Sequence, residues 1–446
     1  MLLTTLFKTF GGETFLSKIS HTLSQGENVL LILPDPYRDL KLLEGISEIL
    51  RKDAGPSLTI LDASKEPAPP QTKLNGQKKR APLPRAKGVL AQLIQDNEIT
   101  QLPPGNNIGV SDFFQSKPGD YLKVWAFCGL ETLNSADQVL ASQELLQIAQ
   151  TTSRNSKERI CGPRFLAMVS PLFPAIPETK GLTVINWWGN ITPADQEYLF
   201  QTIIESRGEN ITPTLYWWLK ALCFSIGGND PLLLTELIKK APVSLEEIKA
   251  ILEEHPFWQY PEAKANFQGI FLFRGLSPYL GNPPQDIHFR SLWAKGLLAP
   301  QRYGFLHPVT FLNDDITLIK NISQGQREVF FPLIDQVHAA ICYRVETIMG
   351  AGIWELYLPM EGDYTQNQNT GDPQDEIGPL AYFLCYKLKG KKNADREIHD
   401  LSYLANCWRI VRVNAAHSKV ISFNILEEAF NQLEHAKNTY FIEIIH

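Results

Sequence analysis

The sequence predicts a multidomain protein in which an α/β domain with a parallel sheet precedes several mainly helical domains. Strand-length apolar runs such as Asn28–Pro34 and Arg164–Val169 alternate with helical segments over the first part of the chain. Continuous apolar runs of this kind are typical of parallel strands that are buried on both faces. Later in the chain apolar residues recur at helical spacing, and 446 residues are enough for roughly two to four domains.

The composition is that of a folded protein. Apolar residues make up 44% of the chain and the net charge is −6, which argues against a surface coated with nucleic acid. The six cysteines are scattered, so they predict buried, reduced thiols and not a zinc site. No apolar run approaches the ~18 residues of a membrane span, and the N-terminus lacks the pattern of a signal peptide. We therefore expect a cytoplasmic protein without membrane contact.

The α/β domain is expected to span residues 1–205. Its strands are expected at residues 28–34, 57–61, 121–127, 164–169 and 182–187, and its helices at residues 14–25, 40–51, 88–95, 135–150 and from Pro193 onward. Residues 64–87 are rich in proline and lysine and lack apolar periodicity. They predict a long, exposed, basic loop, for which contact with nucleic acid or with an acidic partner is the alternative to simple solvation.

Three further segments are expected after the α/β domain. Residues 206–265 predict a helical domain, in which Ser244 and Glu247 have the spacing of a capping box. Residues 266–318 predict a winged-helix-like unit, because a helix ending near Lys295 is followed by a turn and a short hairpin. Residues 319–446 predict an all-helical domain, with helices at residues 331–351, 377–387, 401–417 and 421–436.

An arginine and a histidine on one of these helices are the main catalytic candidates. Arg412 precedes His417, with Arg409 one turn earlier and Asn414 between them. On an ideal helix Arg412 and His417 point about 140° apart, at roughly 100° per residue. They converge only if the helix kinks or ends near Asn414, or if a second chain completes the site. An imidazole can take the proton of a ribose 2′-OH and a guanidinium can stabilise the phosphate, so this pair suits RNA cleavage.

A lysine-rich stretch precedes the same helix. Its members are Lys387, Lys389, Lys391 and Lys392. These lysines are candidates for binding an RNA backbone. A solvated turn is the alternative interpretation.

The order of elements in the first two-thirds of the chain resembles an AAA+/STAND-type NTPase core with a helical lid and a winged helix. Asn28–Pro34 is similar to the strand before the phosphate loop, and Tyr121–Glu131 to the strand that ends in acidic residues. Arg164–Ser170 is similar to the polar-tipped sensor strand, Gly227–Lys239 to the lid and Phe271–Pro308 to the winged helix. The resemblance covers about residues 10–310 and rests on the order of the elements.

The loop after the first strand departs from that family. A phosphate loop needs glycine N–H groups and a lysine, whereas this chain has Pro34, Asp35 and Pro36, and no Gly-Lys-Ser/Thr anywhere. Proline lacks an N–H, and an aspartate repels phosphate. The sequence therefore predicts a degenerate core that does not hydrolyse nucleotide and has no cofactor.

The C-terminal helical region, about residues 320–440, resembles HEPN-like modules. That resemblance implies that two protomers face each other and cut RNA without a metal ion, through the residues that match Arg412 and His417. Asn414 departs from the common pattern, in which the polar residue follows the arginine directly. Glu346 is a candidate supporting carboxylate, with a solvated surface glutamate as the alternative.

Two functions remain as alternatives. The first is an effector or regulator of antiphage defence, in which the inactive core docks or senses and the C-terminal module acts on RNA. The second is a non-catalytic adapter that binds partner proteins in a larger defence or nucleic-acid-processing complex. A DNA-binding regulator has weaker support, because few basic residues lie in the winged-helix-like segment. A metal-dependent or serine hydrolase also has little support, because no metal-ligand spacing or Gly-x-Ser-x-Gly motif is present.

Overall fold

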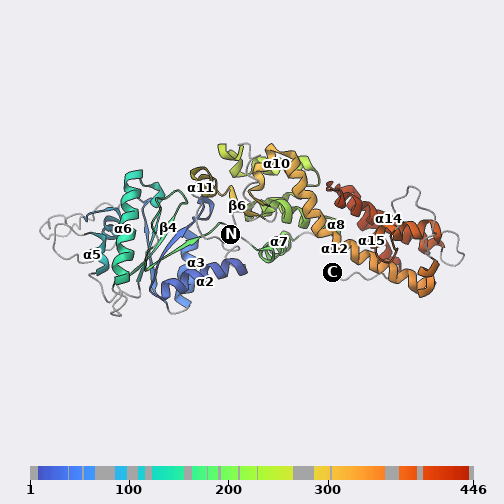
Figure 1. The fold of residues 1–446 in the computed structure, drawn as a ribbon, viewed down its shortest axis with the longest axis horizontal. Coiled ribbons are helices and arrows are strands. Elements are labelled where there is room, and N and C mark those ends of the chain that lie inside the picture. Colours follow the sequence, from blue (N-terminus) through green and yellow to red (C-terminus); the bar gives the residue numbers. More distant parts are fainter. Residues whose placement is uncertain are drawn as a thin grey trace. The chain divides into compact units, whose positions relative to one another are not determined.

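The computed structural model describes most of the chain, and its described residues divide into two compact units (Figure 1). Unit 1 comprises Met1–Leu199 and Phe267–His307, and unit 2 comprises Phe200–Asn266 and Pro308–His446. The described residues are 9–38, 40–52, 55–65, 86–97, 109–115, 123–154, 163–177, 179–188, 192–208, 211–228, 230–264, 286–301, 304–356, 371–388 and 395–440. Most of the predicted basic loop, residues 66–85, lies outside them.

Unit 1 is built on a sheet of five parallel strands in the order β2-β3-β4-β1-β5. The strands are β1 (Asn28–Ile32), β2 (Ser57–Asp62), β3 (Lys123–Cys128), β4 (Arg164–Val169) and β5 (Leu182–Asn186). Each coincides with a predicted apolar run, give or take a residue or two at its ends. The α/β fold class predicted for the first part of the chain is therefore confirmed.

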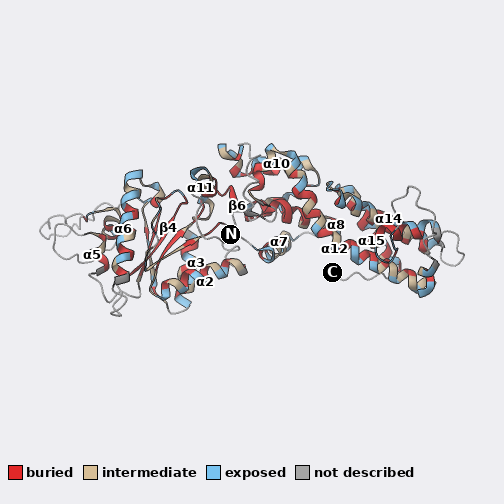
Figure 2. Ribbon diagram, in the orientation of Figure 1, coloured by how far each residue is buried: buried red, intermediate tan, exposed pale blue. Residues whose placement is uncertain are grey.

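Helices cover both faces of this sheet (Figure 1). One face carries α2 (Phe10–Ser24) and α3 (Leu40–Lys52), and the other carries α4 (Val89–Asn97), α5 (Val110–Gln115) and α6 (Ser135–Arg154). Side chains alternate along each strand, so Trp125 and Phe127 of β3 pack toward α4–α6 while both faces of the central strands are buried (Figure 2). Sheet burial on two faces explains why these strands read as continuous apolar runs.

A small helix and hairpin also belong to unit 1. They are α11 (Ile287–Ala294), β6 (Leu298–Gln301) and β7 (Gly304–Leu306). Trp293 of α11 stacks on Trp188, which follows β5, with ring centroids 4.0 Å apart. The Nε and Nη2 atoms of Arg290 donate hydrogen bonds to the Pro171 carbonyl, in the turn after β4, at 2.9 and 2.5 Å. The predicted helix and hairpin are present, and they pack against the loops that follow β4 and β5.

Unit 2 is helical, as predicted for the later part of the chain. Helix α7 (Pro193–Arg207) runs across the boundary between the units. The remaining helices are α8 (Pro213–Leu222), α9 (Pro231–Lys240), α10 (Leu245–Glu254), α12 (Asp315–Met349), α13 (Ile377–Tyr382), α14 (Asp395–Ala416) and α15 (Phe423–Tyr440). Two π-helical turns continue α8 and α13, namely η4 (Cys223–Gly227) and η11 (Phe383–Lys387). Short 3-10 turns occur at Pro256–Gln259, Pro261–Lys264, Pro308–Asn313 and Ala351–Leu356.

The predicted capping residues of unit 2 lie at the start of α10. The Ser244 hydroxyl accepts a hydrogen bond from the Glu247 N–H at 3.2 Å, and the Glu247 carboxylate accepts one from the Val243 N–H at 2.7 Å. The reciprocal bond thus reaches one residue further back than in the usual capping box. Among the helices of the described residues, none is long and apolar enough to cross a membrane.

Candidate functional site

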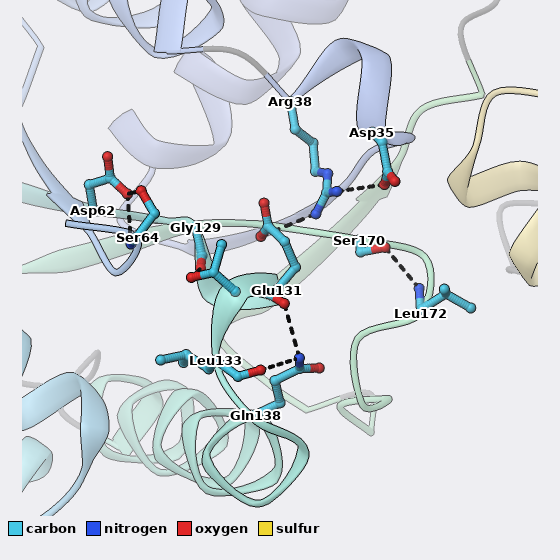
Figure 3. Close-up of polar contacts among 11 residues, drawn as sticks. Asp35, Arg38, Asp62, Ser64, Gly129, Glu131, Leu133, Gln138, Ser170 and Leu172 are labelled. Carbon is cyan, nitrogen blue, oxygen red and sulfur yellow. Dashed lines mark hydrogen bonds and ion pairs between the residues drawn. The ribbon is translucent and has the colours of Figure 1, made fainter. Parts of the chain in front are cut away.

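Polar side chains lie together at the carboxyl edge of the parallel sheet, where they come from the ends of four strands and the loops that follow (Figure 3). Asp35 and Arg38 follow β1, Asp62 ends β2, Glu131 follows β3, and Ser170 follows β4. In open parallel sheets ligands bind outside this edge, at the point where neighbouring strands connect in opposite directions. Here β1 connects toward β2 and β4 connects toward β5, so that point lies between β1 and β4.

An ion pair of Arg38 bridges this point. The Nη2 atom of Arg38 lies 2.5 Å from Asp35 Oδ1, and its Nη1 atom lies 3.1 Å from Glu131 Oε2. Because β4 separates β1 from β3, the pair with Glu131 joins the two loops across the end of β4 (Figure 3). The Arg38 side chain is only 9% exposed, whereas the side chains of Asp35 and Glu131 are 45% and 31% exposed. One buried cation therefore sits between two carboxylates that reach the surface.

The backbone of the loop after β1 is poorly suited to bind an anion. Pro34 and Pro36 have no N–H, and the N–H groups that follow Pro36 form hydrogen bonds within the short helix η1 (Asp35–Tyr37). The Tyr37 N–H donates to the Pro34 carbonyl at 3.0 Å and the Arg38 N–H donates to the Asp35 carbonyl at 3.2 Å. An anion at this edge would thus find few donors and two nearby carboxylates.

The loops after β2 and β3 pack closely against each other. The Asp62 carboxylate accepts hydrogen bonds from the N–H and the hydroxyl of Ser64, at 3.0 and 2.6 Å. Gly129 has φ +69°, and a Cβ atom there would lie 2.7 Å from Asp62 Oδ1 and 2.8 Å from the Ser64 nitrogen. Only glycine fits this position, both for its left-handed backbone and for the close approach. The Asp62 carboxylate therefore stabilises the turn that follows β2.

The loop that carries Glu131 is fixed to the start of α6. The side-chain amide of Gln138 donates hydrogen bonds to the carbonyls of Glu131 and Leu133, at 3.2 and 2.8 Å (Figure 3). The Asn134 side chain caps α6 by accepting from the Asp137 N–H at 2.9 Å. Glu131 is thus held in place to meet Arg38.

Burial dominates the titration of groups at this edge. It raises the pKa of Asp35 above its usual value, although Arg38 and Lys295 oppose the rise. The pKa of the Cys128 thiol is raised to about 12, first by burial and then by the negative charges of Asp62 and Glu131. A thiol that stays protonated is a poor nucleophile, so Cys128 is a core residue and not a reactive group.

This difference in thiol reactivity can be measured. We expect iodoacetamide at pH 8 to modify the exposed Cys385 in the native protein, whereas Cys128 resists it. A thiol with a pKa of about 12 has roughly one thiolate in ten thousand molecules at this pH. Peptide mass spectrometry would follow both sites, with urea-unfolded protein as the control in which both react. Comparable native rates at Cys128 and Cys385 would contradict the burial argument.

Three of the predicted catalytic residues, Arg409, Arg412 and Asn414, lie on α14, which is continuous through Asn414 and ends at Ala416. The Nη2 atom of Arg412 pairs with Glu376 Oε1 at 3.1 Å. Arg409 donates to the Asn406 side chain at 3.1 Å, and the Asn414 amide donates to the Ile410 carbonyl at 2.9 Å. His417 is exposed in the turn after the helix. With no kink at Asn414, the regular helix places Arg412 and His417 on different faces.

A different arginine lies beside the histidine turn. Arg327 of α12 donates hydrogen bonds to the Ser418 hydroxyl at 2.9 Å and to the Ala415 carbonyl at 3.4 Å. Its guanidinium is therefore fixed at the residues that flank His417 within one chain. Sequence reasoning missed Arg327 because it lies far from His417 in sequence and has no motif of its own.

Other predicted residues have structural partners or fall outside the described residues. Glu346 accepts a hydrogen bond from the Trp354 indole at 2.6 Å, which gives this carboxylate a packing role. Lys387 ends the π-turn η11. Lys389, Lys391 and Lys392 lie outside the described residues.

A buried aspartate and a buried histidine form an ion pair within unit 2. His255 Nε2 lies 3.0 Å from Asp230 Oδ2. The same aspartate caps α9 by accepting from the Leu232 N–H at 2.7 Å, and His255 Nδ1 accepts from the Phe257 N–H at 3.3 Å.

Comparisons with known protein families, with curated proteins and with solved structures find no match for this chain. A functional proposal must therefore rest mainly on unit 1. In this unit helices cover both faces of a parallel sheet, and the protein's own polar side chains lie at its carboxyl edge.

Proposed function

We propose that this chain is a non-catalytic adapter, in which a degenerate AAA+/STAND-like domain serves as a docking or sensing scaffold without using nucleotide. The strand order of unit 1 supports the likeness to that class. The strand that precedes Ser170 lies between the first strand and the strand that leads to Glu131, so the three strands that resemble that family are neighbours in one parallel sheet. The order and direction of the strands, however, support a likeness of fold and not an activity.

The Arg38–Glu131 ion pair is the observation that carries this proposal. A nucleotide-binding core keeps this edge open and lines it with N–H donors and a cation that faces the phosphates. In this chain the cation is turned inward and neutralised by Asp35 and Glu131, at 2.5 and 3.1 Å. The edge is thus held in one arrangement by the protein's own side chains. Such an arrangement favours a permanent docking platform for a partner protein.

Nucleotide binding is the direct test of this proposal. We expect isothermal titration with ATP and Mg²⁺ to show no saturable binding at millimolar nucleotide, and no phosphate release. The Arg38→Ala variant should also bind no ATP, because removing the guanidinium leaves two carboxylates that repel phosphate. Saturable ATP binding by the unchanged protein would overturn the proposal, and its loss in Arg38→Ala would show that Arg38 serves nucleotide.

RNA cleavage by the helical region is the second candidate function. The exposure of His417 and the fixed guanidinium of Arg327 beside its turn favour it. On the HEPN-like interpretation, Arg412 would come from the facing protomer of a homodimer, and no metal ion would be needed. In an antiphage context the scaffold would then control this activity.

Cleavage of labelled single-stranded RNA in EDTA separates the two candidates. If the helical region is a nuclease, His417→Ala should reduce the rate by at least about 100-fold, as expected for loss of a general base. Arg412→Ala and Arg327→Ala would show which guanidinium contributes. Equal traces of cleavage in the unchanged protein and His417→Ala would leave the adapter as the supported function.

A further inference from the structure

Strand β2 forms an open edge of the parallel sheet in unit 1. It is the end strand in the order β2-β3-β4-β1-β5, so no other strand of the described residues pairs with its outer side. The strand spans Ser57–Asp62, and its pairing with β3 is continuous in register, without a bulge. Ile60 in its middle is 37% exposed. An edge of this kind presents backbone N–H and C=O groups that can pair with a further strand.

The hydrogen bonds to β3 show which backbone groups of β2 face outward. The Ala63 N–H donates to the Cys128 carbonyl at 2.9 Å. Along a parallel strand the N–H and C=O of one residue point to the same side, and those of the next residue point to the opposite side. Alternate residues back from Ala63 therefore bond β3, whereas the N–H and C=O groups of Leu58 and Ile60 point away from it. No hydrogen bond within the described residues reaches these two outward N–H groups.

The sequence of β2 lacks the features that usually protect an edge strand. Natural edge strands carry lysine, proline or a bulge, or are very short, and these features prevent pairing with another chain. From Ser57 to Leu61 the strand contains serine, leucine, threonine and isoleucine, with no charged residue and no proline. The outer side of β2 is thus unpaired and is also suited to another strand.

A second copy of β2 fits this edge when the two strands run antiparallel about Thr59. In that register Leu58 of each strand lies opposite Ile60 of the other, and these hydrogen-bonded pairs exchange their N–H···O bonds. Their apolar side chains lie next to each other on one face, while the two Thr59 side chains meet on the other face. No charged residue of the strand meets a like charge. The pairing ends at Pro56, which has no N–H.

We propose that β2 is a homodimer interface, at which two copies of this chain join their sheets edge to edge. A second copy is favoured over an unrelated peptide, because the same short sequence supplies both sides of the matched pairs. The inference rests on strand pairing alone and is independent of the adapter function. It also differs from a dimer of the helical region, since the contact lies in unit 1. Few backbone bonds cross the interface, so we expect a weak dimer, with a dissociation constant that is roughly micromolar.

Analytical ultracentrifugation of the full chain over a series of concentrations tests this dimer. We expect Ile60→Pro to raise the dimer dissociation constant by roughly 10-fold or more, because each dimer loses an N–H donor from both copies. Proline is tolerated in an edge strand where its nitrogen faces outward, so the pairing with β3 is kept, and circular dichroism would check the fold. A protein that stays monomeric at every concentration, or a dimer that Ile60→Pro leaves unchanged, would overturn the proposal.

Substitutions that keep the backbone N–H test the interface even if proline disturbs the fold. Ile60→Lys should also weaken the dimer, since a lysine on an edge strand disfavours addition of another strand. Ile60→Val should retain the affinity within about 2-fold, because valine is equally suited to a strand. Val139→Lys, at a 46% exposed position of α6, is the matched control and should have no effect. Equal weakening by Ile60→Lys and Val139→Lys would contradict edge pairing.

Hydrogen exchange provides a readout that needs no variant. Within one chain the amides of Leu58 and Ile60 point away from β3, whereas the Leu61 amide is bonded to it. At concentrations where the dimer predominates, we expect exchange at Leu58 and Ile60 to slow by about 10-fold or more, while exchange at Leu61 stays unchanged. Mass spectrometry with fragmentation would resolve the three amides. Unchanged exchange at Leu58 and Ile60 in the dimer would place the contact elsewhere and overturn the proposal.

Discussion

Replacement of Arg38 by alanine is expected to lower the free energy of unfolding of unit 1 by about 2–3 kcal/mol. Removal of one partner from a fully buried ion pair costs about 3–5 kcal/mol, because the remaining charge has no counter-ion. The loss is smaller here because water reaches Asp35 and Glu131, whose side chains are 45% and 31% exposed. Urea unfolding followed by circular dichroism would measure the change, and hydrogen exchange of the β1 and β3 peptides would localise it to this sheet edge.

A surface ion pair of the same unit is the control for Arg38. Lys52 lies 3.2 Å from Glu48, and both side chains are more than half exposed. Lys52→Ala should change stability by no more than about 0.5 kcal/mol, as is usual for exposed pairs. A double-mutant cycle of Arg38→Ala with Glu131→Gln should show coupling that the Lys52–Glu48 cycle lacks. If Arg38→Ala were as mild as Lys52→Ala, the ion pair would not hold the edge.

The effect of Arg38→Ala should also depend on pH. The pKa of Asp35 is already raised by burial, and Arg38 is the strongest of the groups that lower it. Removal of Arg38 therefore raises this pKa further. At neutral pH the variant holds Asp35 as a carboxylate without its arginine, whereas in acid this group takes up a proton and no longer needs a counter-ion. The stability difference should thus be largest above about pH 6 and shrink as the pH falls through the carboxyl range.

The parallel strands were predictable because burial on two faces leaves a simple mark in the sequence. Arg164–Val169 is apolar apart from its first residue and is buried throughout in β4. The start of α12 was not predictable in this way: the helix begins at Asp315, whereas the apolar pattern predicted residues 331–351. Buried polar residues, among them Asn321 and Gln326, interrupt the apolar stripe there. Gln326 is buried because both of its amide atoms bond the backbone of Ile421, at 2.8 and 3.0 Å.

For the candidate site, the sequence predicted what the loop lacks but not which side chains meet there. The prolines after β1 showed that the loop lacks phosphate-binding donors, since that property is local to the sequence. The partner of Arg38 is not local, because Glu131 meets it only through the parallel order of β1, β4 and β3. The same holds for Arg327 beside His417, which depends on the packing of α12 against α14. Pairings between distant segments require the topology, and periodicity does not supply it.

Unit 2 depends on a close helix crossing at Gly325. This glycine lies inside α12, and a Cβ atom there would lie 2.5 Å from the Ser225 Cβ atom and 2.7 Å from the Ala221 carbonyl oxygen. The carbonyl belongs to α8, so a side-chain rotation cannot relieve the clash. The absence of a side chain at Gly325 is therefore what allows α12 to pack directly on α8 and η4.

Gly325→Ala is expected to destabilise unit 2 by about 2–3 kcal/mol, in the upper part of the usual cost of overpacking. This figure is net of the gain of up to ~1 kcal/mol that alanine brings to a helix interior. Gly45→Ala is the matched control, because Gly45 lies inside α3 and its Cβ atom would meet Leu16 at an ordinary 3.8 Å. That variant should stabilise unit 1 by about 0.5–1 kcal/mol. Hydrogen exchange of the α8 and α3 peptides would read each unit separately. A gain in stability at both glycines would contradict the crossing, since helix propensity alone would then decide both.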